Sequence, residues 1–147
     1  MENVVIKVKK LDPRAILPSR GSPFSAGADL HACMDGPVAV EPGRTVFFHT
    51  GLTAEIPEGY AGFVFARSGL ASKSGLAPAN KVGVVDSDYR GEYMVALHNH
   101  SDVPVTVNPG DRIAQLVVCP VAFTQFEVAE ELSETERGAG GFGSTGK

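Results

Sequence analysis

The sequence predicts an all-β protein made of many short strands, with one short helix and a glycine-rich C-terminal tail. Its 147 residues include 17 glycines and 10 prolines, which place turns too often for long helices. Between the turns lie short runs of β-branched and aromatic residues, which is the composition of strands. A chain of this length buries a real core but does not enclose a deep two-domain cleft, so a site shared between subunits is one option.

Charge and composition exclude several classes of function. A net charge of −4 with only 13 Lys and Arg argues against a broad nucleic-acid surface. No run approaches the roughly 18 apolar residues of a membrane span, and the first ten residues lack the apolar core of a signal peptide. We therefore expect a cytoplasmic protein with no nucleic-acid or membrane partner. Cys33 and Cys119 are expected to be packing thiols, and His49, His98 and His100 strand residues rather than metal ligands.

The first half of the chain alternates strand and turn signals. We expect strands at residues 4–10, 37–40, 45–52 and 61–65. Three prolines make Leu11–Pro23 irregular. The Pro-Gly corners at Glu41–Arg44 and Asn108–Asp111 are alike, which fits a sheet folded back on itself. Residues 68–74 suit a short helix closed by Gly75.

The second half is expected to be strands up to an acidic segment. Residues 76–82 and 93–99 are predicted to be two arms of a hairpin, with residues 83–92 between them. Further strands are predicted at residues 103–107, 113–118 and 123–128. Acidic residues 130–136 then lead into the tail.

The stretch Gly83–Glu92 places ionisable groups directly after an apolar strand. Such a strand would deliver Asp86 to the edge of a sheet, where an ionised aspartate beside apolar neighbours can act as a base toward water. Arg90 could supply the charge that keeps Asp86 ionised, and the ring of Tyr89 could supply a flat wall of the site. The alternative is an ordinary acidic hairpin tip, because structural ion pairs produce similar clusters.

Three other places in the chain could contribute to a site. Small residues crowd in front of Asp29, which permits close backbone approach but also fits tight strand packing. Arg67, Ser68 and Gly69 at a helix start suit a phosphate cradle, or alternatively a capped helix with a surface arginine. Gln115 interrupts a buried strand, where it is either satisfied internally or contacts a ligand.

The tail from Arg137 to Lys147 combines five glycines with one arginine and one phenylalanine. Alone it cannot bury enough surface to become ordered, so one interpretation is a disordered linker. Over a phosphate-bearing ligand it could fold, with Arg137, Ser144 and glycine N–H groups binding oxyanions and Phe142 stacking on a flat ring.

Five strings in order resemble the five motifs of the trimeric dUTPase family. They are AGADL (26–30), RSGLA (67–71), GVVDSDYRGE (83–92), GDRIAQL (110–116) and RGAGGFGSTG (137–146). The resemblance spans residues 26–146. Departures are small: Val85 stands where the family often has isoleucine, and Ala66 where proline often precedes the arginine. Neither affects the expected chemistry.

The resemblance implies a distorted jelly roll of the β-clip type over residues 1–132, and a flexible arm, residues 133–147, that closes over the active site. It implies a homotrimer whose three active sites each take residues from all three chains. The reaction implied is hydrolysis of dUTP to dUMP and pyrophosphate, which keeps uracil out of DNA and supplies dUMP for thymidylate synthesis. Mg²⁺ would bridge phosphate oxygens and keep most of its waters, with Asp29 acting through such waters.

The resemblance also implies a role for each motif. Asp86 would deprotonate a water for attack at the α-phosphorus. Asn80 would read uracil with hairpin backbone groups, and Tyr89 would exclude a 2′-hydroxyl. Arg137 would grip the γ-phosphate while Phe142 caps the base. The substrate-binding residues implied are Arg67, Ser68, Gly69, Asn80, Val85, Tyr89, Gln115, Arg137, Phe142, Gly143 and Ser144.

Two alternatives remain at the level of the sequence. A dCTP deaminase of the same superfamily shares the fold, but its members usually lack such a tail, and no clear counterpart of their deaminating glutamate is present. A catalytically silent deoxynucleotide-binding module is the other. Retention of Asp86, Tyr89 and the whole tail argues against it.

Overall fold

The computed structural model describes residues 4–141 and confirms an all-β chain with one short helix. Within that range the helix is α1 (Ser68–Ser74). The strands are β1 (Lys7–Lys10), β2 (Ala28–His31), β3 (Val38–Val40), β4 (Thr45–His49), β5 (Leu52–Glu55), β6 (Tyr60–Phe65), β7 (Leu76–Pro78), β8 (Gly83–Val85), β9 (Met94–Asn99), β10 (Val105–Val107) and β11 (Arg112–Pro120). Among the described residues, no helix is long and apolar enough to cross a bilayer.

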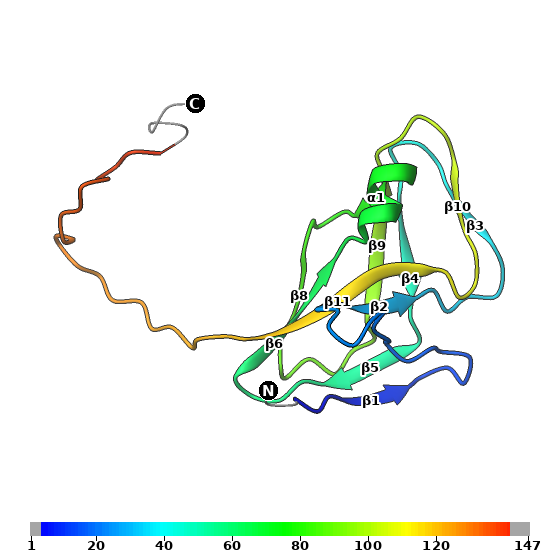
Figure 1. The fold of residues 1–147 in the computed structure, drawn as a ribbon, viewed down its shortest axis with the longest axis horizontal. Coiled ribbons are helices and arrows are strands. Elements are labelled where there is room, and N and C mark those ends of the chain that lie inside the picture. Colours follow the sequence, from blue (N-terminus) through cyan, green and yellow to red (C-terminus); the bar gives the residue numbers. More distant parts are fainter. Residues whose placement is uncertain (1–3, 142–147) are drawn as a thin grey trace.

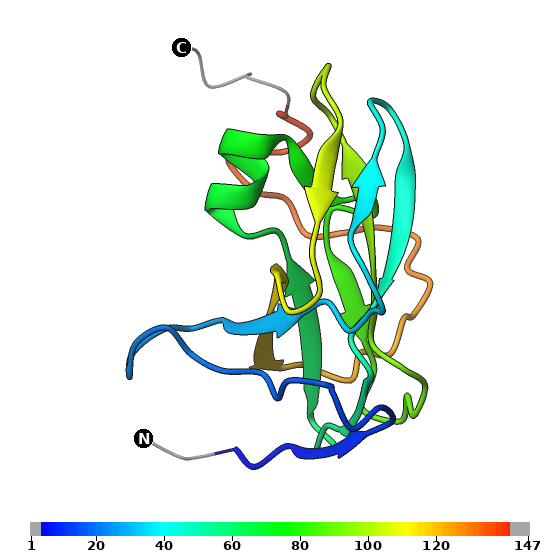
Figure 2. The ribbon, with the colours of Figure 1, turned by 90° about the vertical axis from the view of Figure 1, so that its right-hand side faces the viewer.

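The strands form two main sheets and two ribbons, all with antiparallel pairing. One sheet has the order β2-β11-β6-β8 and the other the order β4-β9-β7. The ribbons are β1-β5 and β3-β10. Figures 1 and 2 show α1 at one end of the body and the β1-β5 ribbon at the other.

The core lies between the sheets and follows the two-residue period of the strands. In β9, Val95, Leu97 and Asn99 are buried and alternate with outward residues, as a half-buried strand requires. Asn99 is a polar member of this core. Its Nδ2 donates to the carbonyl oxygens of Val40 (2.8 Å) and Val103 (2.7 Å), so its burial is compensated by hydrogen bonds.

The strand expected over residues 45–52 is wrong in its extent, because the chain turns at Gly51. This glycine has φ 67°, a left-handed value that strains other residues. A Cβ there would also lie 2.9 Å from Ala15 Cβ and 3.0 Å from Cys33 Sγ. The single strand expected here is therefore two strands, β4 and β5. The turn between them contacts Glu92, as described below.

The expected hairpin arms at residues 76–82 and 93–99 do pair, but over a shorter length. β7 pairs with β9, whereas the chain after Pro78 turns away so that β8 joins β6 in the other sheet. The segment that carries Asn80 and Asp86 thus crosses from one sheet to the other. This crossing opens the pocket described next.

The strand expected at residues 123–128 is not formed. β11 ends at Pro120, and Val121 N–H still donates to Gly59 O at 2.9 Å. The next residues, 122–130, extend away from the body without backbone partners among the described residues (Figure 1). Phe126 is 95% exposed and Val128 99% exposed. The composition is that of a strand, but a strand needs a partner, and the described part of this single chain provides none.

Candidate active site

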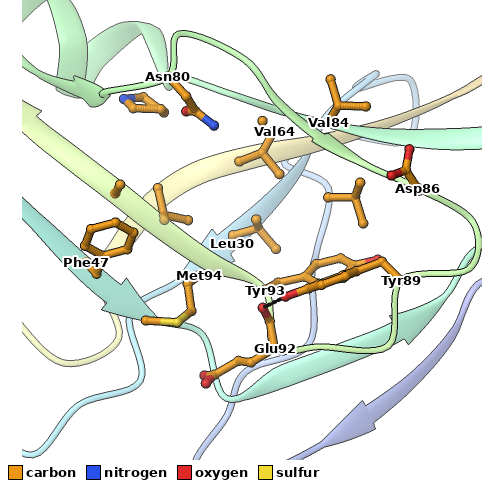
Figure 3. A pocket seen from close by; sticks show the side chains of 15 residues that line it. Leu30, Phe47, Val64, Asn80, Val84, Asp86, Tyr89, Glu92, Tyr93 and Met94 are labelled. Carbon is orange, nitrogen blue, oxygen red and sulfur yellow. Dashed lines mark hydrogen bonds between the residues drawn. The ribbon is translucent and has the colours of Figure 1, made fainter.

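A pocket of about 410 Å³ lies where the chain crosses between the two sheets. Its walls come from the end of β7 and the turn that leads to β8, from β8 and the turn after it, from β9, and from single residues of β2, β4 and β6. Figure 3 shows Asn80 and Asp86 at its rim, Leu30 and Val64 at its floor, and Tyr89 and Tyr93 along one side. An apolar pocket with few polar groups at its mouth suits a flat ring with polar edges.

Asn80 is held by an irregular turn between β7 and β8. The turn is closed by bonds from Lys81 N–H to Pro78 O (3.0 Å) and from Val82 N–H to Asn80 O (2.7 Å). Lys81 adopts φ 66°, which is uncommon for a lysine. A Cβ on Gly83 would lie 3.3 Å from both Asn80 Nδ2 and Val64 Cβ, so the glycine allows β8 to approach β6 and Asn80 closely.

Tyr89 forms the side wall of the pocket by stacking on Tyr93. Their ring centroids are 6.3 Å apart with planes inclined by 25°, and the Tyr89 hydroxyl donates to Glu92 O at 3.1 Å. A Cβ on Gly91 would overlap the Tyr89 hydroxyl and lie 2.8 Å from its Cε2. The glycine therefore makes the room into which the Tyr89 ring folds.

Asp86 follows β8 directly and is exposed to solvent at the pocket rim. Arg90, which could supply a charge beside Asp86, forms no ion pair with it among the described residues. Arg90 Nη1 instead donates to the carbonyl oxygens of Ser87 (2.7 Å) and Tyr89 (3.1 Å), which closes the turn after Asp86. The Asp86 carboxylate is thus left available for a ligand or water.

A second polar cluster surrounds Asp29 at the junction of β2, β11 and the start of α1. Its carboxylate accepts from Arg67 Nε (2.7 Å) and from Arg112 Nη1 (3.2 Å), and its side chain is 15% exposed. Gln115 lies opposite Asp29 in the sheet and donates from Nε2 to Ala66 O at 2.9 Å. Gln115 therefore fixes the backbone immediately before Arg67.

Ser68 and Gly69 open α1 on the surface next to Arg67. The Arg67 backbone is extended and caps the helix without a side-chain hydrogen bond. A Cβ on Gly69 would meet nothing within 4 Å, and its φ is not positive. Among the described residues, neither packing nor backbone conformation requires glycine at this position.

The pocket residues around Asp86 and the cluster around Asp29 lie toward opposite ends of β6. Val85 pairs with Gly62 near the start of β6, whereas Gln115 pairs with Phe65 at its end, two residues before Arg67. At about 3.3 Å per residue, the backbones of Asp86 and Arg67 are about 20 Å apart. The structure thus brings Asn80, Val85, Asp86 and Tyr89 together, and separately Asp29, Arg67, Ser68, Gly69 and Gln115.

The described part of the tail, residues 137–141, joins neither group in this chain. The chain from about residue 125 to 141 extends away from the body (Figure 1), and within this segment Arg137 Nε donates to Gly140 O at 2.8 Å. The other predicted tail residues, Phe142, Gly143 and Ser144, lie outside the described residues.

Reasoning from the sequence missed several residues of these groups. Arg112 stands in a charged motif and could have been found as a partner of Asp29. Glu92 ends the stretch Gly83–Glu92 and Tyr93 follows it, and both line the pocket. Leu30, Phe47, Val64 and Met94 line it as well, but they resemble ordinary strand residues and give no signal in the sequence.

Burial changes the acid–base behaviour of two groups beside the site. The Nδ1 atom of His31 is buried without a hydrogen-bond partner, and desolvation is the main cause that lowers the pKa of this histidine. The Tyr93 hydroxyl is also buried without a partner, and burial raises the pKa of Tyr93.

The hydrogen bonds of the Asp29 carboxylate limit the ways in which this cluster could hold a divalent cation. Both carboxylate oxygens are already engaged by arginines. Among the described residues, no group of three or more His, Cys, Asp or Glu side chains is placed to hold a metal ion. The residues therefore fit a hydrated ion that takes most ligands from a bound phosphate chain and water, as Mg²⁺ prefers.

Comparison with protein families and sequences gives a consistent result. The dUTPase family model matches residues 13–146. A deoxyuridine 5'-triphosphate nucleotidohydrolase of Syntrophotalea carbinolica is 50% identical over 146 residues, covering 99% of each chain. One from Desulfitobacterium hafniense is 51% identical over 149 residues, again covering 99% of each.

Solved structures give the same fold. The dUTPase of Staphylococcus phage 80alpha, solved with dUpNHpp, has a TM-score of 0.89 and 29% identity, covering 97% of this chain and 99% of its own. A phage phi11 dUTPase variant, described for the coordination of a structural Mg(II) ion, has a TM-score of 0.76 and 27% identity, covering 86% and 97%. The architecture is thus the expected distorted jelly roll.

Proposed function

The chain belongs to the dUTPase family and hydrolyses dUTP to dUMP and pyrophosphate, and from this premise we propose which residues perform each part of the reaction. The single observation that supports the assignment best is the pocket that unites Asn80, Asp86 and Tyr89. It offers a ring-sized cavity, an amide and a carboxylate in one place.

We propose that this pocket binds the deoxyuridine part of the substrate. The Asn80 amide can both donate and accept, as the polar edge of uracil demands. Backbone groups around Val85 supply further donors and acceptors at the rim. Tyr89, held against Tyr93, lies where it limits the room beside the sugar, so a 2′-hydroxyl would clash.

The Asp29 cluster is proposed to bind the phosphate chain. Arg67 supplies charge and a planar fork of donors, and Gln115 keeps the preceding backbone in place. Ser68 and the N–H of Gly69 would complete the cradle, where a Cβ on Gly69 would meet nothing within 4 Å in this chain. Mg²⁺ bound to the phosphates would neutralise their charge, with Asp29 reaching it through water.

Asp86 is proposed to be the general base. Its carboxylate takes a proton from a water whose oxygen forms a bond to the α-phosphorus. The bond between the α-phosphorus and the bridging oxygen then breaks, and that oxygen leaves with pyrophosphate while dUMP remains. Such a step depends mainly on positioning and on neutralised charge, which these two groups of residues supply.

The two groups cannot act on one substrate within one chain. A base must lie within hydrogen-bond reach of the attacking water, whereas Asp86 and Arg67 are about 20 Å apart along β6. We therefore propose that the site forms between copies in a homotrimer. Asp86 of one subunit then faces Arg67 of another.

The exposed apolar surface of the chain supports this assembly. Four large apolar side chains after β11 lie almost fully in water: Phe123, Phe126, Val128 and Leu132. A largely apolar groove of about 590 Å³ lies between the N-terminal segment and β11. Burying such surface between subunits is favourable at about 25 cal/mol per Å².

The arm is proposed to complete each site. Residues 1–132 would form the jelly-roll domain, with residues 121–132 packed only in the trimer, and residues 133–147 would close over bound substrate. Arg137 would meet the γ-phosphate and Phe142 the base, with Gly143 and Ser144 adding phosphate contacts. Closure of this kind excludes water and positions the reacting groups.

The assignment is tested by supplying dUTP, dTTP, dCTP and UTP separately with Mg²⁺ and following pyrophosphate and the nucleotide product. We expect pyrophosphate and dUMP from dUTP alone. Asp86→Asn should abolish turnover and retain nucleotide binding, whereas Asp88→Asn, two residues along the same turn, should stay active. Normal turnover by Asp86→Asn would exclude it as the base, and deamination of dCTP would support the rival enzyme.

A further inference from the structure

Glu92 connects the wall of the pocket to a turn distant in sequence. Its Oε1 accepts from the N–H of Gly51 (2.8 Å), and its Oε2 pairs with His49 Nδ1 (2.8 Å). Its carbonyl oxygen accepts from the Tyr89 hydroxyl (3.1 Å). One residue therefore holds the β4–β5 turn with its side chain and the Tyr89 ring with its backbone.

The Glu92 side chain itself does not face the pocket interior. Figure 3 shows its carboxylate directed away from the Tyr89 ring. The side chain is 22% exposed, so its bonds are shielded from water more than those of a surface pair. Its contacts thus belong to the support of the pocket rather than to the binding of a ligand.

Other hydrogen bonds tie the same loop to the same turn. Thr53 Oγ1 donates to Arg90 O at 2.8 Å, and Thr50 Oγ1 donates to Tyr93 O at 2.5 Å. Tyr93 N–H donates to Leu52 O at 2.8 Å. These bonds fix the backbone, but among the described residues Glu92 is the one whose side chain bridges the turn and whose carbonyl holds the Tyr89 hydroxyl.

We propose that Glu92, anchored by the β4–β5 turn and His49, is a positioning residue that sets how strongly the enzyme prefers deoxyribose to ribose. This inference rests on the proposed role of Tyr89 beside the sugar. Without the Glu92 side chain, the carbonyl that holds the Tyr89 hydroxyl loses its anchor, and the ring can yield to a 2′-hydroxyl. Selectivity then falls more than catalysis of dUTP does.

The ratio of kcat/KM for dUTP to that for UTP tests this proposal. The ratio is independent of the fraction of folded enzyme, so a simple loss of stability does not change it. We expect Glu92→Ala to lower the ratio about three- to tenfold, the range that corresponds to loss of one net hydrogen bond. Glu92→Gln should restore most of it, because its amide can accept from Gly51 and donate to His49.

His98→Ala is the matched control. His98 also bonds a β4 residue from β9, through Nδ1 to Thr45 Oγ1 at 2.9 Å, but at the end of the strand pair away from Glu92. The His98→Ala variant should have the same ratio of kcat/KM for dUTP to kcat/KM for UTP as the wild type. An unchanged ratio in Glu92→Ala, or an equal fall in His98→Ala, would overturn the proposal. A wild-type enzyme without preference for dUTP would instead overturn the proposed role of Tyr89, and this inference with it.

Discussion

Substitution of Gly27 by alanine should disturb the cluster around Asp29, which we propose binds the phosphate chain. Gly27 precedes β2, and a Cβ there would overlap Gln115 Oε1 and lie 3.1 Å from its Cδ and 3.2 Å from its Cβ. The Gln115 amide must then move and give up its bond to Ala66 O. The backbone before Arg67 loses its support as a result.

The expected size of the effect follows from these contacts. Overpacking of this kind costs about 1–3 kcal/mol, which includes the lost hydrogen bond of about 1 kcal/mol. Replacement of glycine by alanine stabilises by about 0.4–1 kcal/mol through the unfolded chain. We therefore expect Gly27→Ala to lower the free energy of unfolding by about 1–2 kcal/mol.

Urea unfolding at fixed protein concentration measures this loss, and kcat/KM for dUTP should fall with it. Gly36→Ala is the matched control, because a Cβ there would meet nothing within 4 Å. In a Gln115→Ala background, Gly27→Ala should cost much less, since the overlapping amide is gone. Equal stability of the two alanine variants, or an equal loss in both backgrounds, would refute the reasoning.

Three further predictions concern the phosphate site, acid stability and the arm. Gly69→Ala should leave the free energy of unfolding unchanged within about 0.5 kcal/mol but raise KM for dUTP, because only a ligand meets the new methyl group; an unchanged KM would exclude close approach there. Burial lowers the pKa of His31, so the unfolded chain binds more protons below its ordinary value of 6.5, and stability should fall as pH drops below 6.5. Urea unfolding of His31→Gln at pH 7.5 and 5.5 should show a smaller fall, and an identical fall would contradict this. Deletion of residues 137–147 should leave the oligomer intact by light scattering but strongly reduce kcat, and loss of the oligomer would show that the tail has a structural role.

Much of the fold could be predicted because turn residues, helix caps and strand composition act over a few neighbouring residues. The helix over residues 68–74 and its closing glycine are confirmed, since Gly75 has φ 70° and its N–H bonds Ala71 O. The strand extent failed at Gly51, where the chain turns with a left-handed φ and packs closely against Ala15 and Cys33. Such crowding is visible only once distant segments are placed together.

The site was predictable as motifs but not as an arrangement. Asp86 and Tyr89 lie together because they share one turn, and a sequence shows that directly. The separation of Asp86 from Arg67 depends on the register of β6 with β8 and β11, which no local pattern gives. The bonds of Glu92 to His49 and Gly51 join residues more than 40 positions apart, so they too required the structure.

The most direct test of the account is to mix two inactive variants, Asp86→Asn and Arg67→Ala, after unfolding them together and refolding them. If each site takes Asp86 and Arg67 from different chains, about a quarter of the sites in random trimers combine a wild-type residue of each kind. The mixture should therefore regain about a quarter of wild-type dUTP hydrolysis while each variant alone stays inactive. A mixture as inactive as its parts would contradict a shared site and place both residues in one chain.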